Sequence, residues 1–238
     1  MVRAAAVLAV LAVLGVYYGV SEHLPELSQW GDVAFLGLGL MPLTFLLVWL
    51  ALPLRETAPR ELAVAAVSLV VLAVILELAE LDIAANFVKL AAVAAVGWWF
   101  LGLFEALSWV LLVALLIVPV DAFSVARGPT KEIVENQPQV FNALSVSFPL
   151  PGQHSSAQLG LPDILFFSLF LGAAARFGLR VGWTWLAMTL SFGTTLALAI
   201  GFDVAGLPAL PLLSAAFVLV NADLIWRAYK EGSARPSK

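Results

Sequence analysis

Long, uninterrupted runs of apolar residues follow one another along most of the chain. We interpret eight of them as membrane spans, at roughly 4–20, 33–52, 62–80, 86–104, 106–125, 160–177, 182–200 and 207–227. An α-helix rises about 1.5 Å per residue, so a run of about 20 residues crosses the hydrocarbon core of a bilayer. The runs are continuous and lack the two-residue alternation of membrane β-barrels, so they predict helices.

Two places along these runs need a separate interpretation. The stretch from Ile83 to Ala126 is about twice one bilayer thickness, so it must fold back once. Residues Gly102 to Glu105 form the turn that we predict there. The first run follows Arg3 and lacks a small-residue cleavage pattern, so we expect a retained span rather than a signal peptide.

One long connection, from Arg127 to Leu159, separates the fifth and sixth runs. Within it, residues Leu144 to Phe148 alternate with a period of two and are followed by Pro149, which predicts a short strand. Such a strand either packs against the bundle or offers an edge to an extended peptide. The pattern alone leaves both readings open.

The composition agrees with a membrane protein. Hydrophobic residues make up 62% of the 238 residues and charged residues 12%, against about a quarter charged in soluble domains. We therefore predict an all-α, polytopic transmembrane bundle of about eight spans, with nine as the alternative count, forming one domain over 1–238. It divides into N-terminal helices (1–104), a helix pair with its connecting loop (105–177) and C-terminal helices (182–238). The chain has no cysteine, no HExxH pattern and a net charge of −4, so neither a zinc protease nor a nucleic-acid partner is expected.

The basic residues predict the orientation of the bundle in the cell membrane. If both termini are cytoplasmic, nine basic residues lie inside and three outside, which agrees with the positive-inside rule. The nine are Arg3, Arg55, Arg60, Arg176, Arg180, Arg227, Lys230, Arg235 and Lys238, and the three are Lys89, Arg127 and Lys131.

Two aspartates stand out, because ionisable residues inside spans are costly and usually functional. Asp121 lies near the exit of the fifth run and Asp163 near the entry of the sixth. Consecutive spans run antiparallel, so both carboxylates are expected near the same membrane face at similar depth. Two close carboxylates in a low dielectric share one proton, and such a pair can activate water and polarise a peptide carbonyl. As a structural alternative, each acid could cap a helix or reach the interface; Asp163 follows Pro162 at a helix start.

The segments around these residues resemble those of the presenilin and signal-peptide-peptidase family. Residues 118–125 (VPVDAFSV) resemble the segment around the family's first aspartate, and 127–135 (RGPTKEIVE) the stretch that follows it. Residues 159–163 (LGLPD) resemble the GxGD motif, and 208–210 match the PAL motif. The order of the three motifs and the polarity of their spans agree with a microbial presenilin-like homologue.

The resemblance implies an intramembrane aspartyl endopeptidase that cleaves transmembrane helices or remnant signal peptides. Asp121 and Asp163 would be catalytic; the substrate-binding positions would be Pro208, Ala209, Leu210, Gly160, Leu161, Pro162, Leu144 and Val146. No cofactor, metal or obligatory partner subunit is implied, and the oligomeric state stays open.

The chain departs from the family in several respects. Val120 replaces a tyrosine, Pro162 replaces the second glycine of GxGD, and the span count is one short. A cytoplasmic C-terminus is also more similar to signal peptide peptidases than to presenilins. Two alternatives therefore stay open: a proton-coupled transporter, since paired membrane acids also serve proton relays, and a catalytically inactive homologue that binds membrane proteins.

Overall fold

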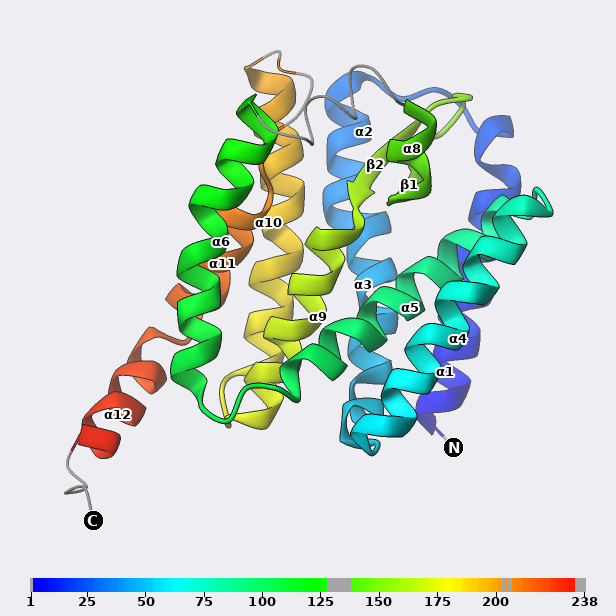
Figure 1. Ribbon diagram of the computed structural model, residues 1–238. Helices are drawn as coiled ribbons and strands as arrows, with labels where there is room; N and C mark the ends of the chain where they lie inside the picture. Colours follow the sequence, from blue (N-terminus) through cyan, green and yellow to red (C-terminus); the bar gives the residue numbers. More distant parts are fainter. Residues whose placement is uncertain (1, 128–137, 203, 205–206, 234–238) are drawn as a thin grey trace.

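The computed structural model describes residues 2–127, 138–202, 204 and 207–233. Helices dominate this part of the chain, and one short β-hairpin interrupts them (Figure 1). The α-helices are α1 (Val2–Val20), α2 (Gln29–Phe35), α3 (Met41–Ala51), α4 (Pro59–Leu78), α5 (Asp82–Leu101), α6 (Leu107–Arg127), α8 (Pro138–Ala143), α9 (Leu161–Arg176), α10 (Val181–Gly201), α11 (Leu210–Val220) and α12 (Ala222–Ser233). A π-helical turn (Leu36–Leu40) joins α2 to α3, and short 3-10 turns follow α1 (Ser21–His23) and α3 (Leu52–Glu56).

Among the described residues, six helical segments are long and apolar enough to cross a membrane, or seven if α11 and α12 form one span across their 64° bend. The eight predicted runs each correspond to helical structure, but two of them differ from a simple span. The run at 160–177 is α9, whose 16 residues extend only about 24 Å at 1.5 Å per residue. The run at 207–227 is broken at Asn221, and the turn predicted at Gly102–Glu105 is confirmed.

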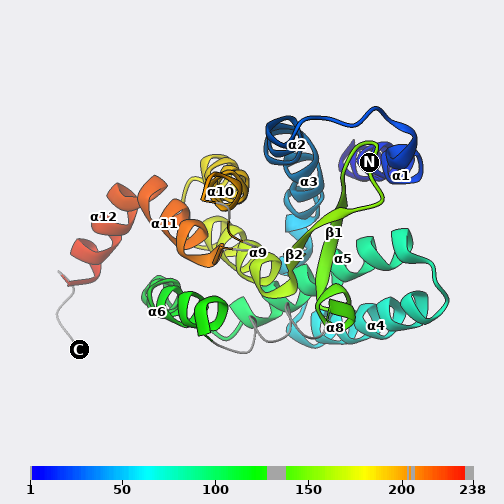
Figure 2. The same cartoon turned by 90° about the horizontal axis from the view of Figure 1, so that it is seen from above.

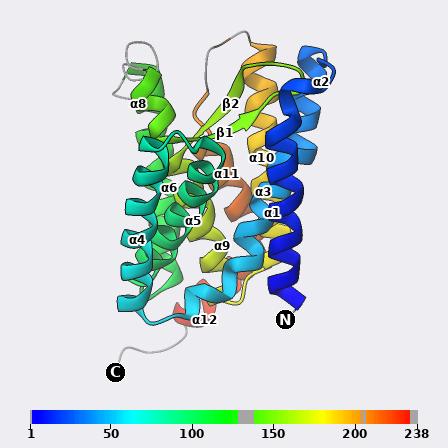
Figure 3. The ribbon, with the colours of Figure 1, turned by 90° about the vertical axis from the view of Figure 1, so that its right-hand side faces the viewer.

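The chain is thus a multi-pass helical membrane protein. The outer helices α1 and α4 expose apolar side chains such as Val13, Val16, Val67 and Val71, as lipid-facing helices do. The start of α1 and the end of α12 lie at the same end of the bundle, and the hairpin lies at the other end (Figures 1 and 3). This arrangement is the one required by the predicted topology, in which both termini share a face. The basic residues Lys131, Arg235 and Lys238, which entered that prediction, lie outside the described residues.

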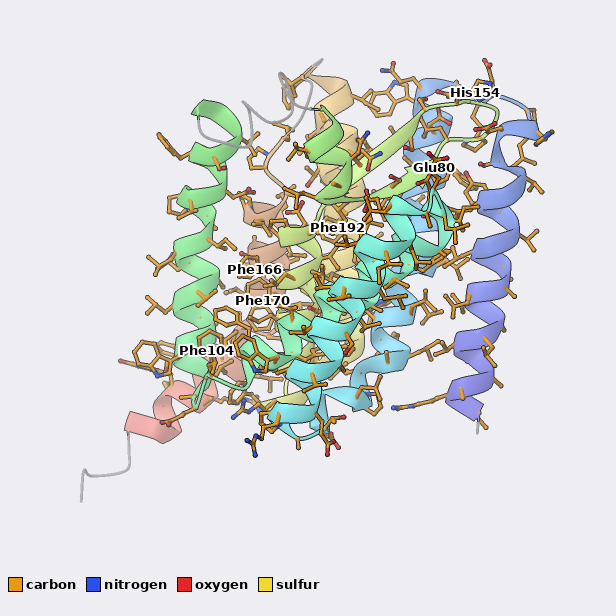
Figure 4. All side chains as sticks on the ribbon, turned by 45° about the vertical axis from the view of Figure 1, so that its right-hand side comes forward. Glu80, Phe104, His154, Phe166, Phe170 and Phe192 are labelled. Carbon is orange, nitrogen blue, oxygen red and sulfur yellow. The ribbon has the colours of Figure 1, made fainter. Side chains whose placement is uncertain are left out.

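Helix α9 occupies the centre of the bundle, where it packs against α5, α6, α10, α11 and β2 (Figure 2). Its side chains Phe167 and Phe170 have no exposed surface, and the Phe170 ring stacks on Phe217 of α11 at 4.8 Å. Phe166, Phe170 and Phe192 lie between the helices in Figure 4, whereas Glu80 and His154 lie at the hairpin end. A helix surrounded by other elements of the protein needs little lipid contact, so its length is not set by the bilayer.

A glycine on α5 allows this central packing. A Cβ atom at Gly97 would lie 2.7 Å from the carbonyl oxygen of Leu165 and would also press on Ser168. No larger residue fits without moving α9 away from α5. Because α9 carries Asp163, the close α5–α9 contact also fixes where that carboxylate lies.

The hairpin consists of β1 (Ser145–Pro149) and β2 (Ser156–Gly160), which are antiparallel and pair Ser147 with Gln158. The strand predicted from Leu144 to Phe148 is confirmed to within one residue. Its partner β2 was not predicted. Val146, Phe148 and Leu159 form the buried face of the hairpin, whose other face carries polar side chains.

Candidate functional site

Asp121 and Asp163 come together where α6 and α9 pass each other. The two carboxylates are close enough to interact electrostatically. Both residues are partly buried. Because α6 and α9 run antiparallel, Asp121 near the end of α6 and Asp163 at the start of α9 lie at the same end of the bundle. The similar depth predicted from the sequence thus agrees with two carboxylates that lie within electrostatic range of each other.

The Asp121 carboxylate is held by the segment that matches the PAL motif, residues 208–210. Its Oδ2 accepts a hydrogen bond from the backbone N–H of Leu210 at 3.1 Å. Leu210 is the first residue of α11, where backbone N–H groups have no partner inside the helix. A carboxylate at this end also benefits from the positive end of the helix dipole. Residues 208–210 thus connect to Asp121 through their backbone, with Ala209 and Leu210 buried and Pro208 partly exposed.

Asp163 is held locally, by the start of its own helix. Gly160 is the N-cap of α9, and its backbone N–H donates a hydrogen bond to the Asp163 carboxylate. An acid at the third helical position that bonds the N-cap N–H is the second half of a capping box. The carboxylate therefore has a structural role whether or not it has a catalytic one.

Local geometry explains why Gly160 and Pro162 fit at the start of α9. Gly160 has φ −60° and ψ 142°, which any residue adopts, so backbone freedom is not why glycine is there. A Cβ atom at this position would lie 3.3 Å from the Asp163 Oδ2 and would crowd the carboxylate. Pro162 lies in the first turn of α9, where proline needs no N–H, so it does not break the helix.

The two residues around β1 that were predicted to bind substrate differ in their surroundings. Val146 is completely buried, while Leu144 precedes β1 and its carbonyl oxygen accepts a hydrogen bond from the Leu161 N–H. Leu161, in the first turn of α9, and Gly160, which ends β2, lie next to Asp163. Of the predicted positions, Gly160 and Leu161 thus lie beside Asp163, Leu144 contacts Leu161, and Val146 is covered by the protein.

The outer edge of β1 is already occupied by side chains that sequence reasoning missed. Asn86 of α5 bonds both backbone groups of Ser147, accepting from its N–H at 2.8 Å and donating to its carbonyl at 3.0 Å. The Tyr18 hydroxyl donates to the same carbonyl at 2.7 Å, and the Tyr17 hydroxyl donates to the Pro149 carbonyl, also at 2.7 Å. A polar amide near the start of an apolar span is the one signal that could have identified Asn86.

The outer edge of β2 has no such cover in the described part of the chain. The strand alternation points the backbone groups of Ser156, Gln158 and Gly160 away from β1. Gly160 donates to Asp163, and no other element bonds the outward groups of Ser156 and Gln158. The open edge of β2 therefore ends at Gly160, beside the two aspartates.

The remaining charged candidates lie away from the aspartates. Lys89 is buried and contacts Glu77 at 3.5 Å and the Asn142 carbonyl at 3.2 Å. Asn221 is completely buried at the bend after α11, where it donates to Thr184 and accepts from the Arg180 N–H. No group of three or more metal-binding side chains occurs among the described residues. Asp203 and residues 128–135, part of the family-like segment, lie outside the described residues.

The fold and the site define a polytopic helical membrane protein with an interacting pair of aspartates. Neither the models of known protein families nor the curated proteins include a significant match to the chain.

Proposed function

We propose that the chain is an intramembrane aspartyl endopeptidase that cleaves transmembrane helices or remnant signal peptides. The observation that carries the proposal is the approach of two carboxylates from different spans, Asp121, which the Leu210 N–H holds, and Asp163 in the first turn of α9, to within electrostatic range of each other. Such a pair shares a proton, so one carboxylate can take a proton from water while the other polarises the scissile carbonyl. Water and the two acids are sufficient for the reaction.

The Leu210 N–H supports a division of roles between the two acids. A hydrogen bond to a carboxylate favours its ionised form, so the bond at Asp121 Oδ2 favours Asp121 as the base. Asp163 then carries the shared proton and donates to the substrate carbonyl. The Gly160 N–H competes with this assignment because it also bonds a carboxylate.

The free edge of β2 supports a binding mode for the substrate. An unwound segment can add to β2 as a third strand through the backbone groups of Ser156 and Gln158. The segment would then run towards Gly160 and the aspartates. This mode replaces the predicted pairing with residues 144–148, since Asn86 and the two tyrosines occupy that edge of β1.

Cleavage of a detergent-solubilised single-span substrate tests the proposal. Asp121→Asn and Asp163→Asn should each lower the cleavage rate by about 10²–10⁴-fold, the usual contribution of one acid or base. Asp82→Asn, at an exposed position at the start of α5, is the matched control and should cleave at the wild-type rate. Thermal unfolding of each variant shows whether the fold is retained.

The alternatives give different results. An inactive binding homologue would cleave none of several substrates, and a proton-coupled transporter would carry protons in liposomes in an Asp121-dependent way. Substantial cleavage by folded Asp121→Asn or Asp163→Asn would contradict the two-aspartate mechanism.

A further inference from the structure

A cavity of about 370 Å³ lies between α2, α10 and the hairpin, away from the two aspartates. Most of its wall is apolar and includes Val33, Leu36, Leu150, Leu196 and Ile200. Ligand pockets commonly start at about this volume and combine apolar walls with a few polar groups. The wall of this cavity includes one carboxylate, Asp32.

Asp32 is buried, with only 8% of its surface exposed, and half of its carboxylate lacks a partner. Its Oδ2 accepts a hydrogen bond from the Gln153 side chain at 3.0 Å. Its Oδ1 has no hydrogen-bond partner, and no cation among the described residues pairs with the carboxylate. Burying an unpaired charge is expensive, so such a group calls for an explanation.

Helix position explains only part of this arrangement. Asp32 lies in the first turn of α2, where a negative charge benefits from the helix dipole. Ser28 already caps the helix by accepting from the Gly31 N–H, so the cap does not need Asp32. The Asp32 carboxylate therefore lines an apolar cavity without a counter-ion among the described residues, which makes the cavity a site for a cationic group.

We propose that this cavity binds a primary ammonium group on an apolar stem, with Asp32 as its counter-ion. The apolar walls suit the methylene stem, while the carboxylate suits the ammonium head. An ion pair at this buried site forms with a charge that is otherwise uncompensated, so the pairing gains more than a surface salt bridge does.

The cavity lies beside β2, so a substrate strand added there could carry the ammonium group, an inference that rests on the proposed function. Ala157 of β2 lines the cavity, three residues before Gly160. A strand rises about 3.3 Å per residue, so roughly 10 Å of an added strand separates the cavity from the capping glycine beside Asp163. The cavity would thus select substrates with a lysine side chain, or a free amino terminus, a few residues from the cleaved bond on the hairpin side of the membrane.

Direct binding to the full chain tests the site without any cleavage. The probes are N-acetyl-lysine amide, norleucine amide and N-acetyl-norleucine amide, which carry a side-chain amine, an α-amine and no amine respectively. Wild type should bind the matching amine at least about tenfold more tightly than the amine-free probe, and Asp32→Asn should remove that difference. Glu26→Gln, which removes an exposed carboxylate from the preceding loop, is the matched control and should behave as wild type. Whichever amine binds identifies the source.

Cleavage then separates failure of this site from failure of the protease. Three substrates carry lysine, methionine or glutamate at one position of the segment that flanks the cleaved bond on the hairpin side of the membrane. Cleavage of each is measured with wild type and with Asp32→Asn. A lysine preference that acts on KM, is about tenfold, and is lost in Asp32→Asn supports the site. Equal cleavage of all three substrates overturns the specificity role while leaving the protease intact. Amine binding without any cleavage would retain the cavity and reject the protease. Equal affinity of all three probes for both proteins would overturn the site itself.

Discussion

The two edges of the β-hairpin are treated very differently by the rest of the molecule. At β1, Asn86, Tyr18 and Tyr17 satisfy outward backbone groups of Ser147 and Pro149. At β2, no other element bonds the outward groups of Ser156 and Gln158 in the described part of the chain. Open strand edges readily pair with other chains, so proteins usually cover them. Closing one edge and leaving the other open beside two aspartates is what a site for an extended peptide requires.

Among the variants of the two edges, the one that blocks the open edge should have the largest effect on cleavage. Gln158→Pro removes one outward N–H, while the ladder bonds to β1 are made by residues 157 and 159. If a substrate strand pairs there, kcat/KM should fall by about 10–100-fold, which corresponds to roughly 1–3 kcal/mol for a hydrogen bond left unmade. Substrate titrations measure this change.

The side chain of Gln158 requires its own control. Its Oε1 accepts hydrogen bonds from the Ser145 and Ser147 hydroxyls at 2.7 and 2.9 Å, so any substitution loses these contacts. Gln158→Ala loses them but keeps the N–H, and the difference between the two variants isolates the backbone group. Equal kcat/KM values for the two variants would count against strand addition at β2.

Opening the closed edge should mainly affect stability. Asn86→Ala leaves the Ser147 N–H without its partner and removes one of two donors to the Ser147 carbonyl. Losing these two hydrogen bonds and a third, from the Asn86 amide to the Tyr18 hydroxyl at 3.3 Å, should lower the free energy of unfolding by about 2–4 kcal/mol. Denaturant titration in detergent measures the loss, and hydrogen exchange at Ser147 should accelerate. A loss below about 0.5 kcal/mol would mean that Asn86 does not hold β1.

The sequence predicts the helices well and their tertiary partners poorly. Apolar runs identify spans because the lipid environment demands them, and the period-two run at 144–148 predicts β1. Strand β2 (Ser156–Gly160) was missed because its only large apolar residue is Leu159, so the alternation is weak. Asp121 and Asp163 were identifiable since charges inside spans are rare. Asp32 was not, because its burial depends on α10 and the hairpin, which are distant in the sequence.

The smallest effect is expected from Tyr17→Phe at the end of the closed edge. The substitution removes the hydroxyl that donates to the Pro149 carbonyl at 2.7 Å but keeps the ring contact with Phe35 at 5.3 Å. One partly buried hydrogen bond is worth about 0.5–1.5 kcal/mol, so the free energy of unfolding should fall by that amount while cleavage stays near the wild-type rate.

Combining Tyr17→Phe with Asn86→Ala sharpens the comparison. If both side chains hold one cooperative strand edge, the double variant should lose less free energy of unfolding than the sum of the single losses, because the first substitution already loosens β1. Strictly additive losses would instead mean that each hydrogen bond acts alone, and that β1 stays in place through its buried face at Val146 and Phe148.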